Sequence, residues 1–122
     1  MRKMIVMIFL LLCNTAAADW FKWLESPQGD ESFVNTNKTK LVGDSLLFVV
    51  RTQLSRPNDN GEQSTETQYE MNCNTRSYKI LQVSFYEDKK WSQLKHRFDP
   101  KDKGRLIRPD TATEILAGIV CE

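Results

Sequence analysis

The chain has 122 residues and a mass of 14.2 kDa, which leaves room for one small domain and excludes a two-domain enzyme. Hydrophobic residues make up 40% and charged residues 27%, as in a packed globular domain rather than a disordered, collagen-like or coiled-coil chain. The formal net charge of +1 gives no overall electrostatic reason to expect a nucleic-acid partner.

The first residues have the pattern of a secretory signal peptide. Two basic residues precede an apolar run from Met4 to Leu12, and three alanines end at Ala18. The run is about half of the roughly 20 residues needed to span a bilayer. We therefore expect residues 1–18 to be removed and residues 19–122 to be exported to the periplasm or the cell surface. Lipidation of Cys13 is the alternative, although Leu12 stands where lipoprotein signals usually carry Gly or Ala.

Two cysteines, Cys73 and Cys121, remain in the exported chain. In an oxidising compartment such an even pair most often forms one disulfide. The bridge would close a loop of about 49 residues and stabilise the fold by about 4 kcal/mol in the chain-entropy description. A redox pair or a metal site fits less well, because there is no C-x-x-C spacing and His96 is the only histidine. No cofactor is expected.

The first half of the chain alternates short apolar segments with turn-forming ones. This alternation predicts strands over residues 20–24, 31–35 and 40–42. Gly43 and Asp44 then predict a tight hairpin turn. The run over residues 45–54 is apolar on both faces, which is typical of a central strand.

A long hairpin is predicted next. Residues 56–64 are rich in Pro, Asn, Asp and Gly and should form an exposed loop. From Thr65 to Cys73 the side chains alternate with the period of two that indicates one buried face. Residues 78–86 are expected to form the partner strand. Ile80 is expected on one face of this strand, and Leu81, Val83 and Phe85 on the other.

The end of the chain predicts an edge strand and a helix. The edge strand is expected over residues 90–98. Thr111 and Glu114 match a capping box, and the apolar residues after Thr111 recur at helical spacing. The predicted fold class is therefore α+β: an antiparallel sheet with a C-terminal helix packed on it, and one disulfide between Cys73 and Cys121.

Catalytic groups are sparse in this sequence. His96 has no second histidine and no motif-placed serine near it, so it is interpreted as a solvated surface residue. Glu66 and Glu70 share one face of a predicted strand, but on a wet face both would ionise normally. A solubilising role is therefore favoured over an acid–base pair. We expect no enzyme, with a small hydrolase as a remote alternative.

Residues 89–108 form a basic tract. They contain eight basic and two acidic residues, a local charge of +6, while the rest of the exported chain carries −7. Such a tract attracts sulfated glycans, acidic proteins or anionic lipid head groups; a merely solvated face is the alternative. Trp91 and Phe98 within it are interpreted as core residues, with a role as contact anchors as the alternative. The candidate binding residues are Lys89, Lys90, Lys95 and Arg97.

Several segments resemble the surface-adhesin protein E family of small exported bacterial proteins. The resemblance is carried by Trp20-Phe21-Lys22-Trp23, Ser32-Phe33-Val34-Asn35, the run from Tyr69 to Leu81 (YEMNCNTRSYKIL), Trp91, and a closing helix that ends in Cys121. It implies a single antiparallel sheet with a C-terminal helix, a Cys73–Cys121 bridge, and non-enzymatic binding of host extracellular-matrix or serum proteins. The characterised adhesins are lipid-anchored, whereas this signal ends in three alanines. A periplasmic accessory or envelope-stress protein is therefore the alternative function.

Overall fold

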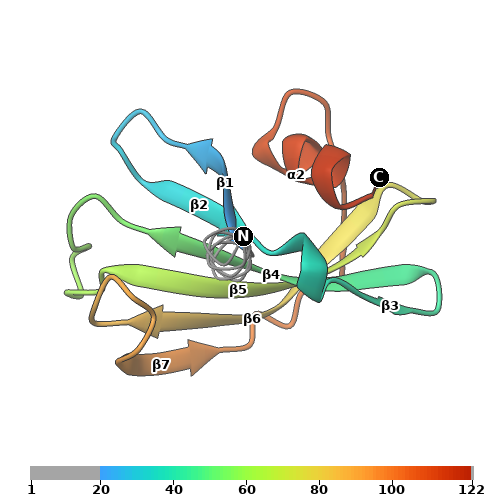
Figure 1. Ribbon diagram of the computed structural model, residues 1–122. Helices are drawn as coiled ribbons and strands as arrows, with labels where there is room; N and C mark the ends of the chain where they lie inside the picture. The colour runs from blue at the N-terminus through green and yellow to red at the C-terminus, as the bar shows by residue number, and fades with distance from the viewer. Residues whose placement is uncertain (1–19, 122) are drawn as a thin grey trace, which may run out of the picture.

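The computed structural model describes residues 20–121, so the predicted signal peptide lies outside the described residues. Within that range an eight-stranded antiparallel sheet carries one α-helix on one side (Figure 1). The helices are a 3-10 helix, η1 (Thr36–Lys38), and an α-helix, α2 (Ala112–Val120). The strands are β1 (Phe21–Glu25), β2 (Glu31–Val34), β3 (Lys40–Val42), β4 (Ser45–Gln53), β5 (Ser64–Asn72), β6 (Ser77–Tyr86), β7 (Leu94–Phe98) and β8 (Arg105–Leu106). The predicted fold class is confirmed.

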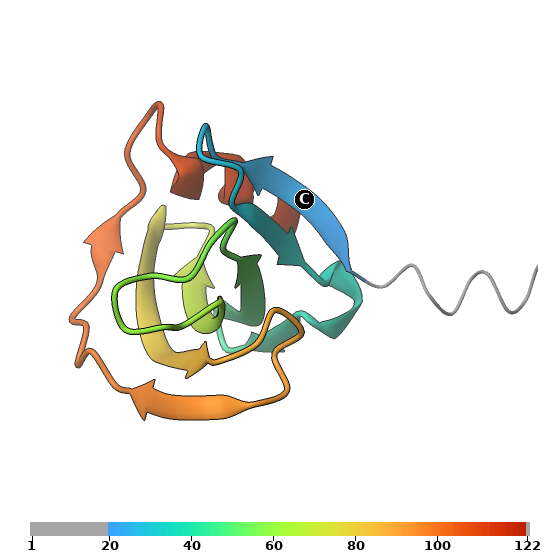
Figure 2. The ribbon, with the colours of Figure 1, turned by 90° about the vertical axis from the view of Figure 1, so that its left-hand side faces the viewer.

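The three long strands β4, β5 and β6 form the centre of the sheet. The strand order is β1-β2-β4-β5-β6-β7. β3 pairs with the beginning of β4, while β2 pairs with the second half of the same edge. In the same way, β7 and β8 pair with opposite ends of one edge of β6. The sheet curves strongly, so that β1 and β7 lie at its two far rims (Figure 2).

Alternate residues of the central strands form the core. On β4, Phe48 and Val50 are buried, and on β5 Met71 is completely buried. Leu116 and Ala117 of α2 pack against this set, so α2 covers the same face of the sheet. Because side chains of a strand alternate between its faces, the residues between them point to the opposite side. We call that opposite side the outer face.

The sequence around Thr111 explains where α2 begins. The Thr111 side chain accepts a hydrogen bond from the Glu114 N–H at 3.3 Å, as the predicted capping box requires. The Glu114 carboxylate accepts from the Asp110 N–H at 3.0 Å, one residue earlier than a standard capping box would place it. The cap fixes the start of a nine-residue helix that would be only marginally stable alone.

The predicted disulfide is confirmed. Cys73 follows β5 directly and is bonded to Cys121 at the end of α2, with a sequence separation of 48. Met71 Sδ lies 3.8 Å from Cys121 Sγ, so the bridge is continuous with the core. The bond therefore ties the covering helix to the sheet that it covers.

The predicted facing of Ile80 is wrong, because β6 contains a bulge. Tyr69 pairs with Ile80 and Gln68 with Gln82, which leaves Leu81 as an extra residue. The extra residue resets the alternation, so Ile80 shares the core face with Val83. The Ile80 N–H donates to the Asp102 carboxylate at 3.0 Å. This hydrogen bond lowers the pKa of Asp102.

Three other expectations need correction. The edge strand β7 begins at Leu94 rather than at residue 90, because residues 87–93 form a hydrogen-bonded turn. The short strand β8 was not predicted, since two residues carry no periodicity. The loop before β5 is not exposed throughout: Glu62 is only 1% exposed and accepts a hydrogen bond from the Asn58 side-chain amide.

Removing the bridge should destabilise the domain strongly. We expect Cys73→Ala to lower the free energy of unfolding by about 2 to 5 kcal/mol, because the unfolded chain then loses a long cross-link. Urea unfolding of the oxidised protein and the variant measures the difference. The wild type unfolded under reducing conditions is the matched control and should resemble the variant. Equal stability of all three samples would contradict the assigned role of the bridge.

Candidate functional site

The predicted basic residues lie on one rim of the sheet, in the turn of residues 87–93 and on β7. Each of Lys89, Lys90, Lys95 and Arg97 is exposed. None of the four forms an ion pair with an acidic residue within residues 20–121. β7 pairs with β6 along one edge and ends the path of the sheet. We call this region, residues 89–98, the basic rim.

Three basic side chains of the rim also contact oxygen atoms of neighbouring segments. Lys89 Nζ lies 3.5 Å from the carbonyl oxygen of Ser55, and Lys95 Nζ donates to the carbonyl oxygen of Asn60. Arg97 Nε donates to the hydroxyl of Ser84 at 3.2 Å. These acceptors are neutral, so they do not compensate the positive charges of Lys89, Lys95 and Arg97. The contacts do restrict where the three side chains lie.

One carboxylate organises the turn that begins the rim. Asp88 accepts hydrogen bonds from the Ser92 hydroxyl at 2.6 Å and from the backbone N–H groups of Ser92, Gln93 and Lys90 at 2.9–3.2 Å. These donors, the Ser92 hydroxyl first, lower the pKa of Asp88 from 3.8 to about 2. The charged Asp88 carboxylate therefore stabilises the turn.

Trp91 and Phe98 are not core residues. Trp91 instead belongs to a second surface, on the outer face of the sheet. Phe98 is 54% exposed on β7. Trp91 lies over the outer face, where its indole N–H donates to the carbonyl oxygen of Thr65 at 2.8 Å. The backbone of Trp91 has a φ of 55°, a left-handed conformation that is uncommon for a bulky residue. The Asp88 turn holds Trp91 in this position.

An arginine lies between two tryptophans on the outer face. The guanidinium of Arg51 is 4.4 Å from the ring centroid of Trp20 and 5.0 Å from that of Trp91. Arg51 Nε donates to Glu66 at 2.9 Å, and the Tyr86 hydroxyl lies 3.4 Å from the same carboxylate. Sequence reasoning missed this cluster, because its members come from four distant segments. The outward-facing arginine in an apolar strand was the one available signal.

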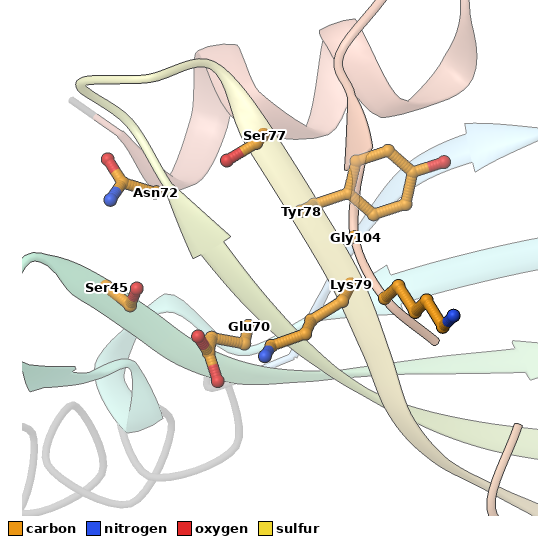
Figure 3. A pocket seen from close by; sticks show the side chains of 8 residues that line it. Ser45, Glu70, Asn72, Ser77, Tyr78, Lys79 and Gly104 are labelled. Carbon is orange, nitrogen blue, oxygen red and sulfur yellow. The ribbon is translucent and has the colours of Figure 1, made fainter. Parts of the chain in front are cut away.

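The same ion pair bears on the two glutamates considered as an acid–base pair. Glu66 is bound to Arg51, and both side chains are only partly exposed. Glu70 instead lines a hollow of about 210 Å³ at the other end of the sheet, together with Ser45, Asn72 and Lys79. In Figure 3 the side chains of Glu70 and Lys79 extend toward one another, whereas Tyr78 points away from them. The two carboxylates therefore have different partners, which favours the interpretation against a catalytic pair.

His96 lies half-exposed on the basic rim. Its ring stacks on Phe85 with centroids 4.7 Å apart, and its Nδ1 is 3.5 Å from the buried Glu62 carboxylate. Among the described residues, no group of three acidic, cysteine or histidine side chains is arranged to hold a metal ion. No helix between residues 20 and 121 is long and apolar enough to cross a membrane.

Fold and surface together define a class of protein: a small disulfide-bonded domain in which one helix covers one face of a curved antiparallel sheet. The chain belongs to the surface-adhesin protein E family, whose profile matches residues 20–122. The family description is that of a surface adhesin. The resemblance inferred from sequence is thereby confirmed.

Solved structures of Haemophilus influenzae protein E have the same fold. Crystal form II is 16% identical, with a TM-score of 0.62 over 85% of this chain and 87% of that one. The selenomethionine form is 17% identical, with a TM-score of 0.61 over 85% and 86%. The protein from a non-typeable strain is 16% identical, with a TM-score of 0.59 over 85% and 76%. No curated protein matches the chain by sequence.

The hydrogen bonds that Asp88 accepts make its contribution to the stability of the folded protein depend on pH. Because its pKa is lowered on folding, Asp88 stabilises the native state above its ordinary pKa, and this contribution is lost as pH falls from about 4 to about 2. We expect Asp88→Asn to remove that part of the acid sensitivity. Urea unfolding of both proteins across this pH range measures it, with Asp59→Asn in the neighbouring loop as control. Parallel stability curves for wild type and Asp88→Asn would contradict the assignment.

Proposed function

We propose that this protein is an exported, adhesin-like binding protein that recognises an acidic host partner through the basic rim. Membership of a surface-adhesin family supports the general role. The observation that carries the proposal is that four exposed cations on the rim, Lys89, Lys90, Lys95 and Arg97, have no acidic partner within the described residues. The partner's chemistry is thus a dense negative charge, as on a sulfated glycan or an acidic segment of a matrix protein.

The charge distribution favours the rim over other surfaces. The basic tract of residues 89–108 carries +6 in an exported chain whose remainder carries −7. An acidic partner is therefore attracted to one region and repelled by the rest, which orients the encounter. Since exposed charges are screened by salt, this attraction should weaken steeply between 0.1 M and 1 M salt, where the Debye length falls from roughly 10 Å to 3 Å.

Replacing the four rim cations tests the proposal. We expect the combined change of Lys89, Lys90, Lys95 and Arg97 to Ser to weaken heparin binding at low salt and to flatten its salt dependence. Heparin affinity at low and high salt measures both. A matched control replaces four basic residues outside the basic tract, Lys38, Lys40, Arg56 and Lys79, and so has the same net charge. If both variants lose affinity equally, only the net charge matters and the rim is a solvated face.

The location of the protein decides between the two functions that the signal peptide leaves open. An adhesin must be displayed, so we expect protease added to intact bacteria to degrade it while a periplasmic marker stays intact. Digestion of the purified, folded protein with the same protease is the control that the native domain is cleavable under these conditions. Complete protection on intact cells, with cleavage after lysis, would support the periplasmic accessory function and rule out the adhesin.

A further inference from the structure

The aromatic cluster around Arg51 contains none of the four cations on which the binding proposed above depends. Its residues lie on the outer face, away from α2, and are only partly buried. A hollow of about 220 Å³ lies between its side chains and is lined by Trp20, Phe33, Arg51, Gln53 and Trp91. The edge of the Phe33 ring meets Trp91, with centroids 6.2 Å apart. Three aromatic rings and a charged, hydrogen-bonded floor thus surround one small cavity.

This hollow is the end of a longer groove. A second hollow of about 180 Å³ shares Trp20 and Arg51 with it. A third, of about 240 Å³, shares Lys38 and Val49 with the second. The groove follows the outward side chains of β4 from Leu47 to Gln53, which at about 3.4 Å per residue is roughly 20 Å. Its shape suits an extended chain rather than a single compact molecule.

The aromatic side chains that line the hollow are positioned by contacts within the protein itself. Trp91 has its indole N–H bound to Thr65 and its backbone held at a positive φ by the Asp88 turn. Strained backbone of this kind persists only where the surroundings enforce it, and such residues cluster at binding sites. The Trp20 ring lies against the Arg51 guanidinium, 4.4 Å from its centroid. Ordering these rings in advance lowers the entropy that a ligand must lose.

We propose that this groove binds the neutral sugar rings of a glycan chain, with the hollow between Trp20 and Trp91 as its principal subsite. A sugar ring has an apolar C–H face, which an indole ring covers, and a rim of hydroxyl groups, which require donors and acceptors. Arg51 and Glu66 supply donors and acceptors beside the rings. Gln53 is oriented by its own hydrogen bond to the carbonyl oxygen of Lys89 at 2.9 Å.

Other ligand chemistries fit this groove less well. A quaternary ammonium group would be repelled by the positive charge of Arg51, whose guanidinium lies 4.4 Å and 5.0 Å from the Trp20 and Trp91 ring centroids. An extended peptide that adds a strand needs a free edge, but β4 is paired on both sides, with β2 and β3 on one and β5 on the other. A purely apolar ligand would bury the Arg51–Glu66 pair without satisfying it.

The test uses the indole N–H signals in NMR spectra of the exported protein. Trp20 and Trp91 line the groove, whereas Trp23 packs against the core and serves as an internal reference. The probes are the methyl glycosides of glucose, galactose, mannose and N-acetylglucosamine, and the N-acetylglucosamine tetramer. We expect at least one probe to shift the Trp20 and Trp91 signals but not that of Trp23, independently of salt.

Two variants make the result specific. Trp91→Gly deletes the ring at a backbone position that glycine adopts without strain, so the turn should still fold. It should weaken the probe's affinity about tenfold, which corresponds to about 1.4 kcal/mol. Phe98→Ala removes an exposed aromatic residue of the basic rim and should leave the affinity unchanged.

Several outcomes would overturn the sugar site. These are the absence of a shift at Trp20 and Trp91 with every glycoside, an unchanged affinity in folded Trp91→Gly, or larger shifts with choline or a tetraproline peptide. The basic rim is judged separately, by salt-dependent heparin binding. If Lys95→Ser with Arg97→Ser reduces heparin affinity while glycoside binding persists, the two sites are distinct; loss of glycoside binding in this variant would count against the sugar site.

Discussion

The covalent tie between α2 and the sheet is the constraint on which the rest of the structure depends. A single curved sheet leaves its apolar face exposed unless another element covers it, and nine helical residues are too few to be stable alone. The Cys73–Cys121 bond holds Leu116 and Ala117 over Met71 and Phe48. With the core face closed in this way, the Arg51 cluster and its hollow lie on the opposite face.

The fold was largely predictable because its signals are local. The alternation from Thr65 to Cys73 and the helix that Thr111 caps each depend on neighbouring residues. Cys73 and Cys121 were the two cysteines expected in the exported chain, so only one pairing was possible. The bulge at Leu81 was not predictable, since the extra residue is visible only against the partner strand. For the same reason the facing of Ile80 was predicted wrongly.

The two candidate sites differ in the same respect. The basic tract consists of neighbouring residues, whereas the Arg51 cluster consists of residues far apart in the sequence. The charge of the basic tract is therefore visible in the sequence, although its binding role remains a proposal. The Arg51 cluster draws on Trp20, Phe33, Glu66 and Trp91, which only the strand order brings together. Sequence reasoning assigned Trp91 to the core because large aromatic residues are usually buried. The positive φ that turns it onto the outer face depends on Asp88, three residues earlier.

The position of β7 at the end of the sheet has a consequence for solubility. An edge strand presents unpaired backbone groups, and two such edges on different molecules can join into a continuous sheet. β7 carries Leu94 and Phe98 in exposed positions, which would favour that association. Lys95 and Arg97 lie between them, and like charges facing each other across a would-be junction oppose it. The cations of the rim therefore protect each molecule from its own copies, whatever else they bind.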